Sequence, residues 1–203
     1  MPDMSESYVK YSVDYTVAPA IEAPHWAEMN DARTRLHHLG LVGLRNGIGF
    51  GNLSIRCNGN EFLISGTATG APPVLGPEGY CLIRSFDPEQ NRVVATGPVQ
   101  PSAESMTHGA VYQSCAGVNG VIHIHSRAIF DGMARDRFPS TPESAAFGTP
   151  EIAIAIGKCV RELGRDAGWI VLLGHDEGVI AYGPSVEQAL MLILELHGKY
   201  QSD

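Results

Sequence analysis

The chain has 203 residues, of which 44% are apolar and 18% are charged. This is an ordinary balance for one globular domain and excludes a disordered or fibrous chain. The 14 basic and 22 acidic side chains leave a net charge of −8 at pH 7, so neither nucleic acid nor an anionic membrane surface is an expected partner. Four cysteines without close pairs, and an N-terminus without a secretion signal, predict reduced thiols in a cytoplasmic protein.

The first 24 residues are polar and weakly patterned, so we expect a flexible N-terminal arm ahead of a single domain over residues 25–203. A helix is predicted from His25 to about Arg45, because apolar residues recur at helical spacing until Asn46-Gly47. Strands separated by turns rich in glycine and proline are predicted at residues 52–56, 62–65, 80–86 and 92–95.

A second helix is predicted to begin at Ser102, as N-cap, and to run to about Gln113. The remaining elements are predicted strands at 121–125, 169–173 and 179–182 and helices at 150–163 and 185–200. Because helices and strands interleave without regular βαβ units, the sequence predicts an α/β domain whose central sheet is covered by helices and is not purely parallel.

The strongest chemical signal is the segment VIHIHS at residues 121–126. Side chains alternate between the two faces of a strand, so His123 and His125 would project from one side, about 7 Å apart along it. They could share a divalent ion, or they could be a hydrogen-bonded pair at a strand end. His175 follows another apolar strand and a glycine, and three histidines with an open position are typical of a catalytic zinc site.

Two further segments could contribute to a site. Glu104 and His108 are four residues apart on a predicted helix and share a face, although a carboxylate in the first turn could serve only to offset the helix dipole. The glycines of residues 49–52 would let a ligand approach the backbone closely, or they could simply form a tight turn. The motifs of serine hydrolases, P-loop nucleotide triphosphatases and dinucleotide dehydrogenases do not occur.

Taken in chain order, the segments of residues 26–200 resemble the class II aldolase/adducin family. The segments that carry this resemblance are GNLSIR, FLISGT, PSAESMTHGAVY, VIHIHS and LLGHDEGVIAYG. The resemblance implies a three-layer α/β/α domain with a mainly antiparallel central sheet, assembled as a homotetramer.

The resemblance also implies roles for seven residues. The implied zinc ligands are His123, His125 and His175. The implied catalytic residue, which would move protons beside the metal, is Glu104. The implied substrate-binding residues are Asn52, Thr67 and Ser102.

The expected activity is that of a zinc-dependent aldolase-type lyase that cleaves or forms a C–C bond in a small hydroxy-carbonyl substrate through a metal-stabilised enediolate. The same family includes epimerases, dehydratases and decarboxylases, which remain alternatives. A non-catalytic adducin-like interaction module is an alternative of a different class, which has no reason to keep the metal ligands together.

The sequence departs from the family pattern near the implied substrate and metal sites. Ala103 stands where relatives commonly have a second serine, and the nearest basic residues in the sequence, Arg56 and Arg84, lie outside the matched motif positions. We therefore expect a weakened phosphate site and a carboxylate or unphosphorylated polyol as substrate. Asp176 and Glu177 follow the third histidine, so Glu177 could replace or supplement His175 as a ligand.

Overall fold

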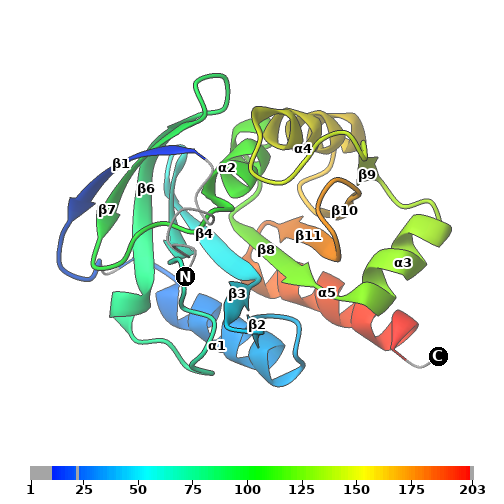
Figure 1. Ribbon diagram of the computed structural model, residues 1–203, viewed down its shortest axis with the longest axis horizontal. Helices are drawn as coiled ribbons and strands as arrows, with labels where there is room; N and C mark the ends of the chain where they lie inside the picture. Colours follow the sequence, from blue (N-terminus) through cyan, green and yellow to red (C-terminus); the bar gives the residue numbers. More distant parts are fainter. Residues whose placement is uncertain (1–10, 22, 202–203) are drawn as a thin grey trace, which may run out of the picture.

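The computed structural model describes residues 11–21 and 23–201, which form a nine-stranded sheet with helices on both faces (Figure 1). The strands of the sheet are β1 (Ser12–Val17), β4 (Asn52–Asn58), β5 (Glu61–Ser65), β6 (Tyr80–Asp87), β7 (Arg92–Gly97), β8 (Gly120–His125), β9 (Ser140–Thr141), β10 (Gly168–Leu172) and β11 (Gly178–Gly183). A separate hairpin consists of β2 (Gly43–Arg45) and β3 (Ile48–Phe50). The helices are α1 (Trp26–His38), α2 (Ser105–Ser114), α3 (Arg127–Arg135), α4 (Pro150–Leu163) and α5 (Val186–Tyr200), with a short 3-10 helix at Pro77–Gly79.

The strand order is β1-β7-β6-β5-β4-β8-β11-β10-β9. Neighbouring strands run antiparallel except at the two edges, where β1 pairs with β7 and β9 pairs with β10 in parallel. The prediction of a mainly antiparallel α/β sheet is therefore confirmed, and the parallel edge pairs make the sheet mixed. None of the helices in the described ranges is long and apolar enough to cross a membrane.

Helices cover both faces of the sheet, so its central strands are buried on two sides. Helices α1, α3 and α5 form one hydrophobic core against Ile122 and Ile124 of β8. Helices α2 and α4 form the other core, to which Val121 of the same strand contributes. This alternation along β8 places the side chains of His123 and His125 on the α2 side of the sheet.

Residues 12–17 differ from the predicted flexible arm. They form the edge strand β1, in register with β7 from Ser12 opposite Arg92 to Val17 opposite Gly97. Only Val13 and Tyr15 of this strand pack against the core, between polar neighbours, so the apolar pattern is too short to stand out from a polar segment. Residues 1–10 and residue 22 of the predicted arm lie outside the described residues.

The predicted helix over residues 25–45 is wrong beyond His38. The chain instead turns into the β2–β3 hairpin, whose tip is Asn46-Gly47 with φ values of 53° and 81°. Positive φ at two successive residues is the conformation that an Asn-Gly hairpin turn requires. The hairpin places Arg45 beside the glycine segment that leads into β4.

The other predicted helices and strands are confirmed within a few residues at each end, including α5, whose N-cap Ser185 accepts a hydrogen bond from the backbone N–H of Gln188. Helix α3 was not predicted. It begins directly after β8, where Ser126 caps it by accepting a hydrogen bond from the backbone N–H of Ile129.

Candidate metal centre

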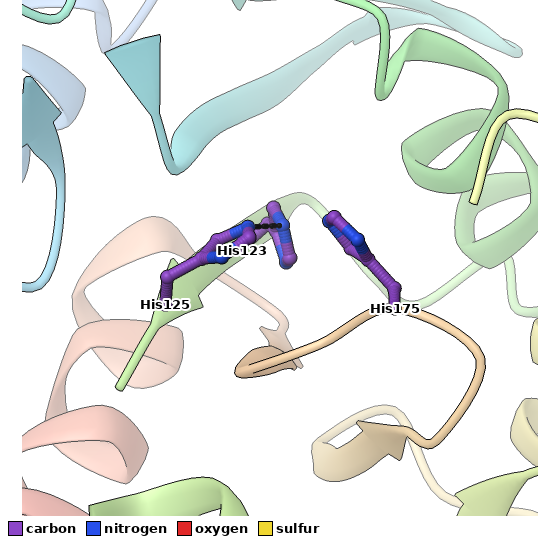
Figure 2. Close-up of side chains that lie close together, drawn as sticks. All are labelled: His123, His125 and His175. Carbon is purple, nitrogen blue, oxygen red and sulfur yellow. Dashed lines mark hydrogen bonds between the residues drawn. The ribbon is translucent and has the colours of Figure 1, made fainter. Parts of the chain in front are cut away.

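Three histidines converge at one end of the central strands (Figure 2). His123 and His125 project from β8, and His175 comes from the turn between β10 and β11. One ligand nitrogen from each imidazole can be chosen so that all three lie within 4.8 Å of one another. The structure thus brings together side chains from two segments that are far apart in the chain.

The orientation of His123 suits a metal ligand. Its Nδ1 lies 3.2 Å from the carbonyl oxygen of Val179 and can donate to it, which leaves Nε2 unprotonated and facing the cluster, 3.0 Å from Nε2 of His125. Burial lowers the pKa of His123 well below its usual value, and burial, followed by the charge of His175, lowers the pKa of His125 to about 4. Neutral imidazoles oriented by backbone carbonyls are the form that binds a divalent ion, so the donor set fits zinc.

Aromatic rings hold the other two imidazoles. The ring of Phe147 stacks on His175 with centroids 4.4 Å apart and an angle of 18° between the planes. Phe50, from β3, meets His125 edge-on at 5.9 Å. These contacts restrict the rotation of both imidazoles and so favour one arrangement of the three nitrogens.

Glu104 lies in the loop that leads into α2. The helix begins at Ser105, so Glu104 occupies the N-cap position rather than the first turn, and the prediction of Ser102 as N-cap is wrong. The hydroxyl of Ser102 instead accepts hydrogen bonds from the Glu104 backbone N–H at 3.2 Å and from the Asn52 side-chain amide at 3.0 Å. The Ser102 carbonyl accepts a bond of 2.5 Å from the Tyr11 hydroxyl, so the residue before β1 also braces this loop.

The Glu104 carboxylate points at the histidines. Its Oε1 lies 3.2 Å from Nε2 of His175 and 3.8 Å from Nε2 of His123, and its Oε2 accepts a hydrogen bond of 2.5 Å from the Thr107 hydroxyl. Burial raises the pKa of Glu104, but the two histidines and Thr107 together outweigh burial and hold it below the usual range. The Glu104 carboxylate therefore faces the three imidazoles, two of which hold its pKa low.

All seven site residues named from the sequence line one cavity of about 360 Å³, a size that suits a small molecule. These residues are Asn52, Thr67, Ser102, Glu104, His123, His125 and His175. Backbone pairing explains part of this convergence, since Asn52 of β4 lies opposite His123 of β8. Thr67 is brought beside Ser102 by its backbone N–H, which donates to the carbonyl of Gln100.

Arg45, which was not predicted as a site residue, also lines the cavity. Its Nη1 lies 2.6 Å from Oε2 of Glu177, so Glu177 pairs with an arginine and is not part of the histidine cluster found among the described residues. Arg56 and Arg84 do not line the cavity: Arg56 donates to backbone carbonyls, and Arg84 pairs with Glu61. The Asn46-Gly47 pair, which is typical of a hairpin turn, was the sequence signal that could have placed Arg45 at the cavity.

Gly51, in the cavity wall, tolerates no side chain. Its φ is +73°, and an added Cβ would lie 2.5 Å from Cγ1 of Val42 and 3.1 Å from the carbonyl oxygen of His123. We expect Gly51→Ala to combine a left-handed backbone cost of about 1–2 kcal/mol with overpacking of about 1–3 kcal/mol. Thermal denaturation should show a Tm lower by at least about 4 °C.

Gly47→Ala is the matched control for this prediction, because Gly47 has a φ of +81° with no atom within 4 Å of an added Cβ. Gly47→Ala should lower the free energy of unfolding only by the cost of the left-handed backbone, about 1–2 kcal/mol. Equal Tm values for the two variants would contradict the close packing assigned to Gly51.

His108 gives the stability of the protein a pH dependence. The imidazole is fully buried on α2, with Nδ1 2.7 Å from the Ser54 hydroxyl, and burial lowers its pKa to about 4. The unfolded chain binds this proton near pH 6.5, so the contribution of neutral His108 is complete above pH 6.5 and is lost as the pH falls towards 4. We expect a loss of roughly 3 kcal/mol in the free energy of unfolding over this range.

Urea denaturation of the wild type and of His108→Gln at pH 7, 6, 5 and 4 would measure this dependence. Both proteins keep the other histidines, so the difference between their pH profiles isolates His108. Parallel profiles would contradict the assignment.

Comparisons with known proteins identify the family and the fold of the chain. The family described as Class II Aldolase and Adducin N-terminal domain matches residues 27–200. No curated protein sequence matches the chain.

Solved structures of similar fold include l-fuculose-1-phosphate aldolase from Thermus thermophilus, with 21% identity, a TM-score of 0.62, and coverage of 87% of this chain and 90% of that chain. A sugar-phosphate aldolase from Thermotoga maritima has 16% identity, a TM-score of 0.63, and coverage of 86% and 90%. YgbL from Klebsiella pneumoniae, whose description names aldolase, epimerase and decarboxylase as alternatives, has 18% identity, a TM-score of 0.64, and coverage of 86% of each chain. At these identities the likeness is one of fold.

Proposed function

The chain belongs to the class II aldolase and adducin N-terminal domain family, and on this premise we propose that it is a zinc-dependent lyase of the aldolase type. Its substrate would be a small β-hydroxy-carbonyl compound in which the C–C bond between the α and β carbons is cleaved or formed. The observation that carries the proposal is the Glu104 carboxylate, whose Oε1 lies 3.2 Å from Nε2 of His175 and which shares one cavity with the three histidines.

The residues that would hold the metal are His123, His125 and His175. A divalent ion bound there supplies a Lewis acid for the carbonyl oxygen of the substrate. Three imidazoles suit zinc, and they also accept nickel, cobalt, copper or iron, so the ion is part of the proposal.

Glu104 is the residue that would move the proton. Thr107 donates to Oε2 and thereby fixes the carboxylate, which leaves Oε1 on the side of the histidines. An ionised carboxylate can accept the proton released in forming a C–C bond and return it when the bond is cleaved. Its burial limits direct contact of the carboxylate with bulk water.

Asn52, Thr67 and Ser102 would orient the substrate. The Asn52 side chain is held by its donor bond to Ser102, while its Oδ1 is buried and accepts no hydrogen bond from the described residues. An acceptor of this kind suits a substrate hydroxyl, because an unsatisfied buried oxygen costs roughly 1–3 kcal/mol. Thr67 and Ser102 add hydroxyls to the same wall of the cavity.

Epimerisation, dehydration or decarboxylation through a similar carbanion is the second candidate function. It is favoured by the similarity to YgbL, whose description names epimerase and decarboxylase beside aldolase. A non-catalytic interaction module is disfavoured, because such a module gains nothing from a buried carboxylate placed against three converging imidazoles.

Proton exchange tests the proposal even while the substrate is unidentified. The zinc-loaded protein would be incubated in D₂O with a panel of ketoses and hydroxy acids, and NMR would follow deuterium incorporation at the carbon next to the carbonyl. We expect exchange with at least one compound, and none with His123→Ala. The products then separate C–C cleavage from epimerisation, dehydration and decarboxylation. A zinc-loaded protein that exchanges no proton in the whole panel would contradict the proposal.

The proposal includes a homotetrameric assembly and a cytoplasmic location. The β2–β3 hairpin supports assembly, since Leu44 and Ile48 expose half or nearly half of their surface beside the cavity and would be buried by a neighbouring subunit. All four cysteines are free, as in a reducing compartment. Analytical ultracentrifugation of the full chain tests the assembly, and a monomer at micromolar concentration would contradict it.

A further inference from the structure

Arg45 is a cation at the mouth of the cavity. Among the described residues that line the cavity it is the only arginine or lysine, and half of its side chain is exposed. Its guanidinium lies 5.0 Å from the centroid of the Phe50 ring, and the His125 ring lies 5.9 Å from the same centroid. Because both groups lie close to the Phe50 ring, the Arg45 guanidinium is near the His125 imidazole. One small molecule can therefore contact Arg45 and the histidine cluster together.

Arg45 already binds a carboxylate, which belongs to Glu177. Their Nη1–Oε2 distance is 2.6 Å. Glu177 has a second cation, because its Oε1 lies 3.5 Å from Nε of Arg127, which in turn binds Asp176. If Arg45 turned to another carboxylate, Glu177 would keep Arg127 as a partner. Exchange of one carboxylate for another at Arg45 would therefore leave no charge unpaired.

From this arrangement we propose that Arg45 binds a carboxylate group of the substrate, at the end remote from the three histidines. The proposal rests on the proposed function, since it assumes that the other end of the substrate lies at the metal centre. The substrate class becomes a hydroxy-carbonyl acid whose carboxylate displaces Glu177 from Arg45.

A carboxylate fits this position better than a phosphate does. The planar guanidinium matches a carboxylate with two parallel N–H donors. A phosphate dianion requires several donors, yet Ala103 offers no hydroxyl, and no second arginine or lysine is among the described lining residues. The pairing with Glu177 shows that the side chain of Arg45 can hold a carboxylate in this place.

Calorimetry with two hydroxy acids tests the proposal on the zinc-loaded protein. Malate and lactate can both bind zinc through a hydroxyl and a carboxylate, but only malate carries a second, distal carboxylate. We expect malate to bind roughly 10-fold or more tightly than lactate, the range of one charge-assisted hydrogen bond. Arg45→Met should abolish this advantage and leave lactate binding unchanged.

Two further variants sharpen the test. Arg127→Met removes the cation that Glu177 would keep after displacement, but Arg127 does not line the cavity, so the advantage of malate should become smaller without being abolished. Glu177→Gln removes the competing carboxylate and should increase the advantage. The proposal would be overturned if the wild type bound malate no more tightly than lactate. It would also be overturned if the advantage of malate survived in Arg45→Met or did not increase in Glu177→Gln.

A third ligand, 3-phosphoglycerate, carries a distal phosphate. Binding stronger than that of malate, and dependent on Arg45, would overturn the assignment of a carboxylate. Failure of the wild type to take up zinc would overturn the proposed function together with this inference. Normal zinc uptake with an unchanged response to Arg45→Met would overturn this inference alone.

Discussion

His123→Ala is expected to abolish stoichiometric zinc binding, whereas the wild type should retain close to one zinc per chain after dialysis. His123 is fully buried, its Nδ1 is held by Val179, and its Nε2 lies between His125 and Glu104. Loss of a residue that only orients a ligand typically weakens metal binding 10–100-fold, so loss of a direct ligand should exceed that range. Elemental analysis of the dialysed proteins gives the zinc content directly.

Thermal denaturation gives a second readout. Zinc at 100 times its Kd would stabilise the wild type by about 2.7 kcal/mol, which corresponds to a Tm rise of roughly 5–10 °C for a domain of this size. The rise should be absent in His123→Ala and intact in the control His38→Ala, because His38 is exposed and lies outside the cluster. Equal zinc content in wild type and His123→Ala would show that the three histidines are not the metal site.

The histidine cluster could be predicted from the sequence because its parts depend on local geometry. The alternation of side chains along a strand is enough to place His123 and His125 on one face, and Gly174 before His175 marks the end of the next apolar strand. The convergence of these segments followed from the family resemblance, because strand order depends on pairings between distant residues that periodicity alone does not reveal.

The features that were missed depend on tertiary contacts. The apolar residues of β1 are only Val13, Tyr15 and Val17, and the strand is stabilised chiefly by its pairing with β7. A helix is predicted at Arg45 because Leu44 continues the helical spacing of apolar residues, while the Asn-Gly turn that follows favours a hairpin. The carboxylate of Glu177 could be seen in the sequence, but its pairing with Arg45 crosses 132 residues.

Glu104→Gln is expected to keep zinc and fold while it lowers the rate of substrate proton exchange by roughly 10²–10⁴-fold, the usual contribution of a general acid or base. The amide has the shape of the carboxylate, and its oxygen can still accept the hydrogen bond from Thr107. It cannot, however, accept a proton at neutral pH. Deuterium incorporation by NMR measures the rate, and elemental analysis and Tm show whether the metal centre and the fold are intact.

A purely structural role for Glu104 makes a different prediction, namely that a charge near the start of α2 stabilises the helix dipole by about 0.3–1 kcal/mol and that exchange is unaffected. The geometry argues against this role. Glu104 occupies the N-cap position, yet its side chain caps no backbone N–H of α2, and both of its oxygens are directed elsewhere, to Thr107 and to the histidines. Glu104 lines the cavity and its Oε1 faces the histidines there, so the carboxylate is placed at the cavity and does not cap the helix. A normal exchange rate in Glu104→Gln with a lowered Tm would assign Glu104 to the helix and leave the proton transfer to another residue.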